Sequence, residues 1–288
     1  MSKPTQGAWL ATLVITSIAT CSTQSSAYNP LNREEYLAKI KQAEALYKDK
    51  CEKVAGISIY KTVPDVEGVL LMKVRPERSD RELADPNWPG AAFGGEFYGD
   101  SYIRTFLGYE YRGVDKNGVM SSVRGYINTD KRPEGLPGYR WVEVIDEKDG
   151  RRHRITGSQK VVGKKDTTAK GVQMAMEKDP NYDLNIYRWS LDKSVSNSPS
   201  PRYGVTYEDH VIPEDRYLGV ASSTVKVIDL QTNEVLGEMI RYAWSPGAPS
   251  RVNPSPWLTA YRCPDHARGT SEATRKFVDQ ILIPAKEK

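Results

Sequence analysis

The sequence predicts an α+β protein, in which a mostly antiparallel β-sheet is accompanied by an N-terminal and a C-terminal helix. Two stretches, near residues 32–54 and 271–283, carry apolar side chains at helical spacing. Between them, short runs rich in β-branched and aromatic residues alternate with turn-forming residues. Helices at both ends with a series of strands between them are typical of the α+β class.

The first helix has a well-marked start. Asn32 can cap it, Glu35 occupies the reciprocal capping-box position, and Leu31 can pack against Tyr36. The apolar residues that follow share one face of the helix: Tyr36, Leu37, Ile40, Ala43 and Tyr47. We expect the helix to end near Val54, ahead of Gly56, and its apolar stripe to pack on another element.

Two strands and a long irregular segment are expected next. Residues 57–63 alternate and end at the turn pair Pro64-Asp65, whereas residues 66–74 are more continuously apolar, as in a central strand buried on both faces. Residues 75–99 have no clear periodicity, and segments of this kind are often functional or mobile. Their aromatic residues are Trp88, Phe93, Phe97 and Tyr98. Two interpretations stay open, because these residues could contact a partner or fold back as a lid over the core.

The middle of the chain predicts antiparallel strands over residues 102–111, 119–127, 139–146 and 152–162. Residues 115–118 contain Asn-Gly, a strong hairpin turn, and residues 147–150 form a second turn. A short helix is expected around 172–176, and residues 194–201 are typical of an exposed loop.

The last third predicts a hairpin of residues 225–230 and 235–244, joined by a turn at 231–234. A proline-rich connection over 246–256 leads to the closing helix at 271–283, which Pro284 ends. The chain has no clear internal repeat and no linker that forces a boundary, so residues 28–288 are expected to form a single α+β domain.

The composition excludes several classes of function. The 288 residues carry 41 Lys and Arg against 37 Asp and Glu, a net charge of +4, which argues against a nucleic-acid binder. Three scattered histidines and three distant cysteines exclude a dense zinc module. His210, close to Glu208 and Asp209, lacks the fixed spacing of a metalloprotease helix. We therefore predict neither a metal nor a cofactor.

Residues 1–27 are typical of an export signal. Lys3 gives a positive start, and the apolar run from Ala8 to Thr20 is shorter than the ~20 residues that span a bilayer. Two processing routes stay open. Residues 18–21 resemble a lipobox, which would lipidate Cys21 and anchor the protein at the outer membrane, although Thr20 departs from the usual small residue. Residues 25–27 fit ordinary cleavage before Tyr28. Either route places the mature chain in the periplasm.

Export has a consequence for the remaining cysteines, Cys51 and Cys263. Two cysteines in an oxidising compartment predict one disulfide, which would join the end of the first helix to the segment before the last one.

The sequence also contains residues that allow one enzymatic interpretation. Gly99-Asp100-Ser101 is similar to the nucleophile block of one esterase class, and Asp265-His266 lies near the C-terminus, where such an enzyme needs its base. However, Tyr102 follows the serine where that class usually has leucine, and no Gly-x-Ser-x-Gly elbow is present. A serine esterase using Ser101 and His266 is therefore the alternative prediction.

Three stretches carry a resemblance to exported bacterial proteins: residues 59–71, 207–216 and 227–235. Some members of this group are similar to the periplasmic immunity proteins that accompany type VI secretion lipase effectors. The resemblance transfers no catalytic residue; it implies a non-enzymatic envelope protein that binds another protein and blocks a toxic effector. The sequence places the contact surface at loop 85–99, with Trp88, Phe93, Phe97 and Tyr98.

Overall fold

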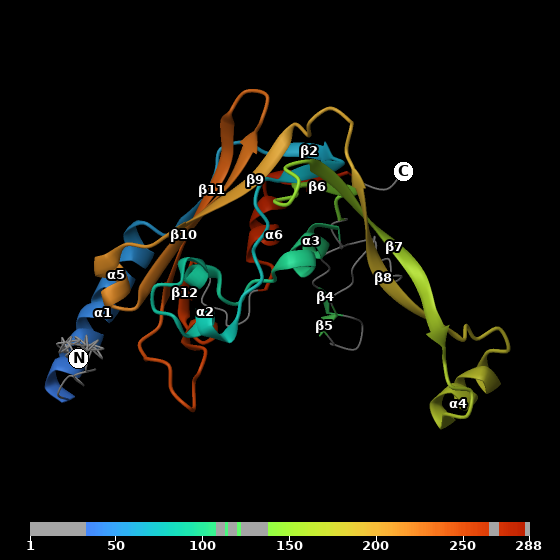
Figure 1. Ribbon diagram of the computed structural model, residues 1–288, viewed down its shortest axis with the longest axis horizontal. Helices are drawn as coiled ribbons and strands as arrows, with labels where there is room; N and C mark the ends of the chain where they lie inside the picture. The colour runs from blue at the N-terminus through green and yellow to red at the C-terminus, as the bar shows by residue number, and fades with distance from the viewer. Residues whose placement is uncertain (1–32, 108–112, 115–119, 122–137, 265–270, 286–288) are drawn as a thin grey trace, which may run out of the picture.

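The protein is an α+β fold built on a large mixed, mostly antiparallel sheet, as the sequence predicts (Figure 1). The computed structural model describes residues 33–107, 113–114, 120–121, 138–264 and 271–285. Its helices are α1 (Arg33–Lys53), α2 (Asp80–Ala84), α3 (Gly99–Leu107), α4 (Lys170–Lys178), α5 (Pro213–Tyr217) and α6 (Ala273–Val278), with short 3-10 helices η1 (Pro89–Phe93) and η2 (Pro256–Leu258). Its strands are β1 (Gly56–Ile59), β2 (Val63–Val66), β3 (Gly68–Leu71), β4 (Gly113–Val114), β5 (Met120–Ser121), β6 (Trp141–Ile145), β7 (Arg152–Lys164), β8 (Asn185–Val195), β9 (Tyr203–His210), β10 (Val220–Asp229), β11 (Glu234–Trp244), β12 (Tyr261–Cys263) and β13 (Leu282–Pro284).

In the described part of the chain, the main sheet has nine strands. Eight follow the order β1-β11-β10-β9-β3-β6-β7-β8, and β12 pairs with β11. The short strand β3 runs parallel to both of its neighbours, β6 and β9, and all other pairs in this sheet are antiparallel. Because β3 joins two antiparallel halves, all four of its residues are buried, as expected of a central strand.

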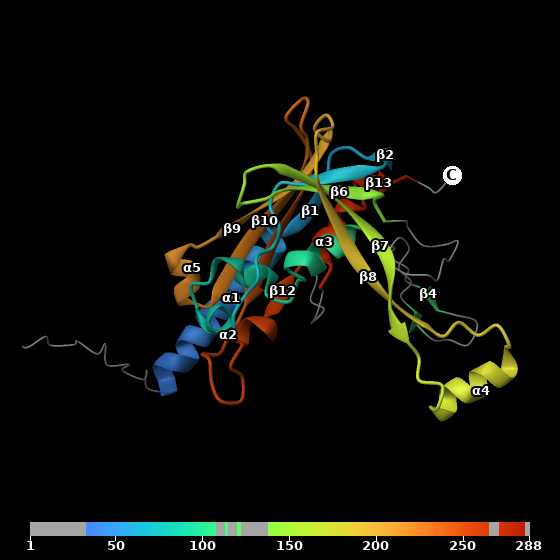
Figure 2. The same ribbon diagram turned by 45° about the vertical axis from the view of Figure 1, so that its right-hand side comes forward.

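The main core lies between this sheet and the short helices. η1 packs on β9, β10 and β11, while α3 packs on β6 and β7. Figure 2 shows α3 beneath the sheet in the turned view as well. The buried cluster joins residues far apart in the sequence, among them Phe93, Phe106, Tyr139, Val225 and Phe277.

A second, smaller core forms where α1 packs on β11. Ala43 and Tyr47 of α1 are buried against Tyr242 and Trp244, and the rings of Tyr47 and Trp244 lie 5.8 Å apart. The predicted helix is therefore confirmed, but its apolar stripe is only half covered. Its first turns remain exposed at Tyr36 and Leu37.

The strand predicted over residues 102–111 is wrong in the part that the structure describes, because residues 99–107 form helix α3. Alternating Tyr102, Arg104 and Phe106 mimic a strand, yet Tyr102 and Phe106 are also one helical turn apart, and their rings pack at 5.5 Å. Ile103 and Leu107 complete the buried face. The segment is helical because a helix brings these four apolar side chains to one face, which covers the core beneath the sheet.

Other elements differ from the prediction in extent. The strand expected over 57–63 is divided into β1 and β2, and the turn pair Pro64-Asp65 lies inside β2, with Asp65 at a positive φ of 58°. Loop 75–99 contains α2, which has a capping box between Ser79 and Glu82, and η1. The closing helix is only α6, and the chain then forms β13, which pairs in parallel with β2.

The other elements compare with the sequence-based expectations as follows. The helix around 172–176 and the hairpin β10–β11 are confirmed. Strands β8 and β9 were not predicted. The turn at 115–118 lies outside the described residues, although its flanking strands β4 and β5 pair antiparallel. Among the described residues, no helix is long and apolar enough to cross a membrane.

Candidate interaction surface

A long hairpin leaves the body of the molecule and carries α4 at its end (Figures 1 and 2). Strand β7 pairs with β6 only as far as Ile155, but its pairing with β8 continues to Lys164 opposite Asn185. We call residues 156–192, the part beyond the reach of β6, the arm. It consists of a two-stranded ribbon and the α4 segment that joins the strands.

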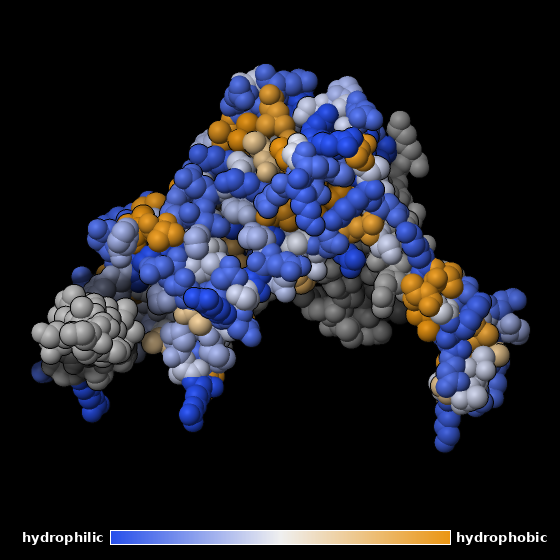
Figure 3. Space-filling model, viewed as in Figure 1, coloured by the Kyte–Doolittle hydropathy of each residue, from blue (hydrophilic) through white to orange (hydrophobic). Residues whose placement is uncertain are grey.

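The arm has no buried side chain among its residues whose side chains the structure describes. Val161, Val162 and Ile186 on the ribbon are 55%, 52% and 43% exposed, and Met174 and Met176 on α4 are 57% and 39% exposed. Figure 3 shows apolar side chains gathered on the arm, at the right of the view. A projecting segment that carries several exposed apolar groups and buries none of its described side chains is a candidate binding surface.

The strands of the arm also have backbone edges that pair with no other described strand. In the described part of the chain, β8 is the last strand of the sheet, and the arm portion of β7 pairs only with β8. A two-stranded hairpin alone is marginally stable in water, and its free edges can pair with another chain. The register shifts between Val161 and Gly163, which leaves Val162 as an extra residue. Such bulges re-aim side chains and increase strand twist.

Polar contacts fix the end of the ribbon where the α4 segment begins. The Lys165 ammonium donates to the Tyr182 hydroxyl (2.9 Å) and to the Asp183 carbonyl (2.8 Å). Asp166 accepts hydrogen bonds from the backbone and hydroxyl of Thr168, and these bonds hold the pKa of its carboxyl below the usual value. The connection is therefore ordered by local hydrogen bonds and not by burial.

The aromatic residues predicted to bind a partner lie mostly inside the body. Trp88 and Phe93 are buried, Phe97 is partly buried against the core, and Tyr98 alone of the four is exposed. The loop thus folds back over the core, which is the second of the two interpretations of this segment. Partner binding by these residues stays a prediction, with Tyr98 as the side chain at the surface.

A buried polar network explains why the loop turns inward. Nη1 of Arg75 donates to both oxygens of Asp209 (2.7 and 2.9 Å), and its Nε donates to Glu96 (3.1 Å). Glu96 also accepts the backbone N–H of Thr274, and Asp209 accepts the hydroxyl of Ser223. Burial alone would lower the pKa of the Arg75 guanidinium, but Glu96 and Asp209 raise it above its ordinary value. One guanidinium therefore ties the loop to β9 and the C-terminal segment.

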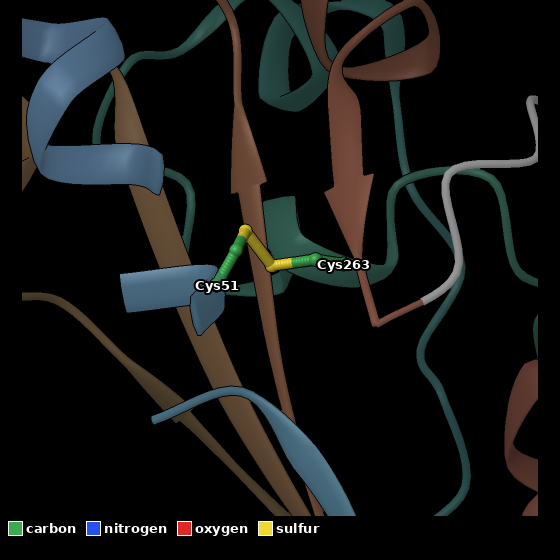
Figure 4. The surroundings of a disulfide bond; sticks show 2 residues. All are labelled: Cys51 and Cys263. Carbon is green, nitrogen blue, oxygen red and sulfur yellow. A yellow bond between two sulfur atoms is a disulfide. The ribbon is translucent and has the colours of Figure 1, made fainter. Parts of the chain in front are cut away.

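The predicted disulfide is present. Cys51, in the last turn of α1, is bonded to Cys263 of β12, with Cα atoms 5.8 Å apart and a separation of 212 positions in the chain (Figure 4). It lies beside the smaller core that α1 makes with β11. A disulfide of this kind indicates an oxidising, extracytoplasmic compartment.

The residues of the enzymatic alternative are described only in part. Ser101 is exposed in the first turn of α3, and its backbone N–H donates to the Tyr98 carbonyl. His266 lies outside the described residues, as do residues 1–27 with the lipidation candidate Cys21. His210 hydrogen-bonds to Thr224 through Nε2 (3.0 Å), while its neighbour Asp209 is engaged by Arg75.

Another cluster of ligand types is Asp146, Asp149 and His153 in the β6–β7 turn. Each aspartate accepts a backbone N–H two residues ahead, and His153 lies 3.1 Å from Asp149. These contacts are those of the turn itself. Comparisons of the chain with protein-family models, with curated proteins and with solved structures found no match.

Proposed function

We propose that the protein is a non-enzymatic, protein-binding module of the cell envelope, and that the arm is its main contact surface. The observation that carries this proposal is the absence of any buried side chain among the described arm residues, together with five large exposed apolar groups on the arm. The cost of leaving such groups in water is removed when a partner covers them. The disulfide supports a site of action outside the cytoplasm.

The chemistry of the arm fits a protein partner. Valine and isoleucine on a ribbon offer a firm apolar surface, and the two methionines of α4 can adapt their shape to an opposing surface. The free backbone edges of β7 and β8 in the described part offer strand pairing in addition. An arm of this shape can enter the mouth of an active site and exclude substrate. We propose that it does so against a secreted toxic effector of the lipase type, which is the partner that the sequence resemblance implies.

The first experiment measures complex formation with the protein encoded beside this one. Both are produced in the periplasm, and binding is followed by size-exclusion chromatography and calorimetry, with survival of the host as the functional readout. We expect a stable complex and protection from toxicity. Failure of both would end the proposal.

The second experiment locates the surface with a matched pair of variants. Val161→Asp places a charge on the arm, whereas Val252→Asp places the same charge on a valine that is 96% exposed in the loop after β11. Because a charge buried without a partner in an interface is costly, Val161→Asp should weaken binding about tenfold or more. Val252→Asp should bind as the wild type does. Equal effects would refute the assignment of the arm.

The esterase alternative has a direct test. Hydrolysis of p-nitrophenyl esters is measured for the wild-type protein and for Ser101→Ala. Activity that disappears in Ser101→Ala would replace the proposed function by an enzymatic one; no activity, or activity that Ser101→Ala leaves unchanged, would end the alternative.

A further inference from the structure

A pocket with a volume of about 400 Å³ lies on the opposite side of the molecule from the arm, between α1, α5 and the loop after β11. This volume falls in the range of small-molecule sites, ~300–1,000 Å³. Its lining is mostly apolar and includes Ile40, Ala43, Leu218, Pro246 and Trp257. Apolar walls of this kind favour a ligand with a hydrocarbon body.

The charged residues among those that line the pocket are both cations, Lys39 and Arg216. Lys39 is partly buried, and its ammonium lies 3.9 Å from the centre of the Tyr217 ring, which also lines the pocket. Because no carboxylate is present in the described lining, the pocket presents only positive charges on its wall. It therefore complements a ligand that carries a negative charge.

Arg216 is a buried arginine whose guanidinium forms hydrogen bonds through only one of its three nitrogens in the described part of the chain. It is 3% exposed, and its Nη2 donates to the carbonyls of His210 (2.9 Å) and Pro89 (3.3 Å). Its Nε and Nη1 have no hydrogen-bond partner among the described residues. Arg75 and Arg275, in contrast, are each paired with a carboxylate in direct contact.

The environment of Arg216 penalises its charge. Burial lowers the pKa of this guanidinium to about 10, although Asp209, Asp85 and Asp215 oppose the shift from a distance. The guanidinium lies 5.5 Å from the ring of Trp257, whose indole N–H is fixed by the Asp85 carbonyl (2.8 Å). An anion in the pocket would offset a charge that the fold leaves without an ion pair.

We propose that this pocket binds an amphiphile with an unbranched apolar chain and a single carboxylate, as in a medium- or long-chain fatty acid. The chain lies on the apolar wall made by α1 and Trp257, and the carboxylate is oriented toward Arg216 and Lys39. The site is independent of the arm, so it can be tested without the protein partner.

Binding is measured by calorimetry with three probes that share one chain length: decanoate, decanol and decylamine at pH 7. We expect saturable binding of one decanoate per protein, about tenfold weaker binding of decanol, and no detectable binding of decylamine. No binding of decanoate, or equal binding of decanoate and decylamine, would overturn the proposal.

A pair of variants places the probe in the pocket without disturbing the core. Ala248→Trp puts a large ring at an exposed position of the pocket lining, and Val252→Trp puts the same ring nearby in the same loop but outside the lining. Ala248→Trp should lower decanoate affinity at least tenfold, and Val252→Trp should leave it unchanged. Decanoate binding that Ala248→Trp does not alter would refute this location.

The charged end is tested with Lys39→Gln and Arg216→Gln. Each should lower the affinity for decanoate several-fold and leave the affinity for decanol unchanged, because only the carboxylate interacts with the cations. Circular dichroism identifies a variant that is not folded; since Arg216 is buried, Lys39→Gln keeps the test valid if Arg216→Gln does not fold. A folded variant whose affinity for decanol falls as much as its affinity for decanoate would contradict the proposed orientation of the ligand.

Discussion

At the scale of single residues, the structure is organised by buried arginines that join segments distant in the chain. Arg75 connects loop 75–99 with β9 and, through Glu96, with Thr274. Arg275 donates to Asp279 and to the carbonyls of Thr105 and Phe106 at the end of α3. These residues look like surface charges in the sequence, because burial of a charge depends on partners that no local pattern reveals.

Arg75→Met tests the larger network. It leaves Glu96 and Asp209 in the interior without their cation, so we expect a loss of about 3 kcal/mol or more in the free energy of unfolding. Urea unfolding measures the loss, with Arg251→Met as the control at an exposed arginine. A loss in Arg75→Met no larger than that in Arg251→Met would contradict the structural role of the network.

Asp229 gives a pH-dependent prediction. Its carboxyl accepts a hydrogen bond from Arg202, which is the main reason that its pKa lies below the usual value, and it also accepts the N–H of Gln231 in the β10–β11 turn. Because the folded pKa is lowered, this stabilisation is present above about pH 4 and is lost as the pH falls through the folded pKa.

Asp229→Asn should therefore lower the urea midpoint at pH 7, and its difference from the wild type should shrink toward pH 3. Glu147→Gln, at an exposed carboxylate, serves as the control. If the difference in urea midpoint between Asp229→Asn and the wild type grew as the pH fell, the proposed role of Asp229 would be contradicted.

At the scale of elements, local signals predicted what local interactions determine. The hairpin β10–β11 could be predicted from its turn residues, and helix α1 from its apolar periodicity. Strand β9 was missed because it holds an acidic residue, Asp209, whose partner Arg75 is 134 residues away. The helix at α4 was predicted, but its exposure was not. That exposure follows from the end of β6 pairing at Ile155, which is a property of the topology.

The arm can be shortened to test its independence from the core. Lys164 and Asn185 are opposite each other, so residues 165–184 can be replaced by Asn-Gly, a two-residue hairpin turn. Thermal unfolding should remain cooperative, with a stability within about 1 kcal/mol of the wild type, because no buried side chain is removed. Partner binding should weaken with the loss of Met174 and Met176. A body that no longer unfolds cooperatively would show that α4 contributes to the fold.

At the scale of the whole molecule, the disulfide connects the end of the first helix with a strand in the C-terminal part of the chain. It closes a loop of more than 200 residues, and it holds α1 to β12 beside the smaller core. In the chain-entropy model such a link stabilises the fold by up to about 5 kcal/mol. The Cys51→Ser, Cys263→Ser double variant should therefore unfold at lower urea, and a reducing agent should lower the midpoint of the wild type but not of the variant. Identical midpoints for the wild type and the variant would contradict this role.

The function proposed for the whole molecule depends on the arm being the part that a partner covers. Hydrogen exchange of the free protein and of its complex with the protein encoded beside it tests this claim most directly. We expect fast exchange at residues 156–192 in the free protein and strong slowing there in the complex, with loop 75–99 unchanged. Slowing confined to loop 85–99, or no slowing in the arm, would contradict the account.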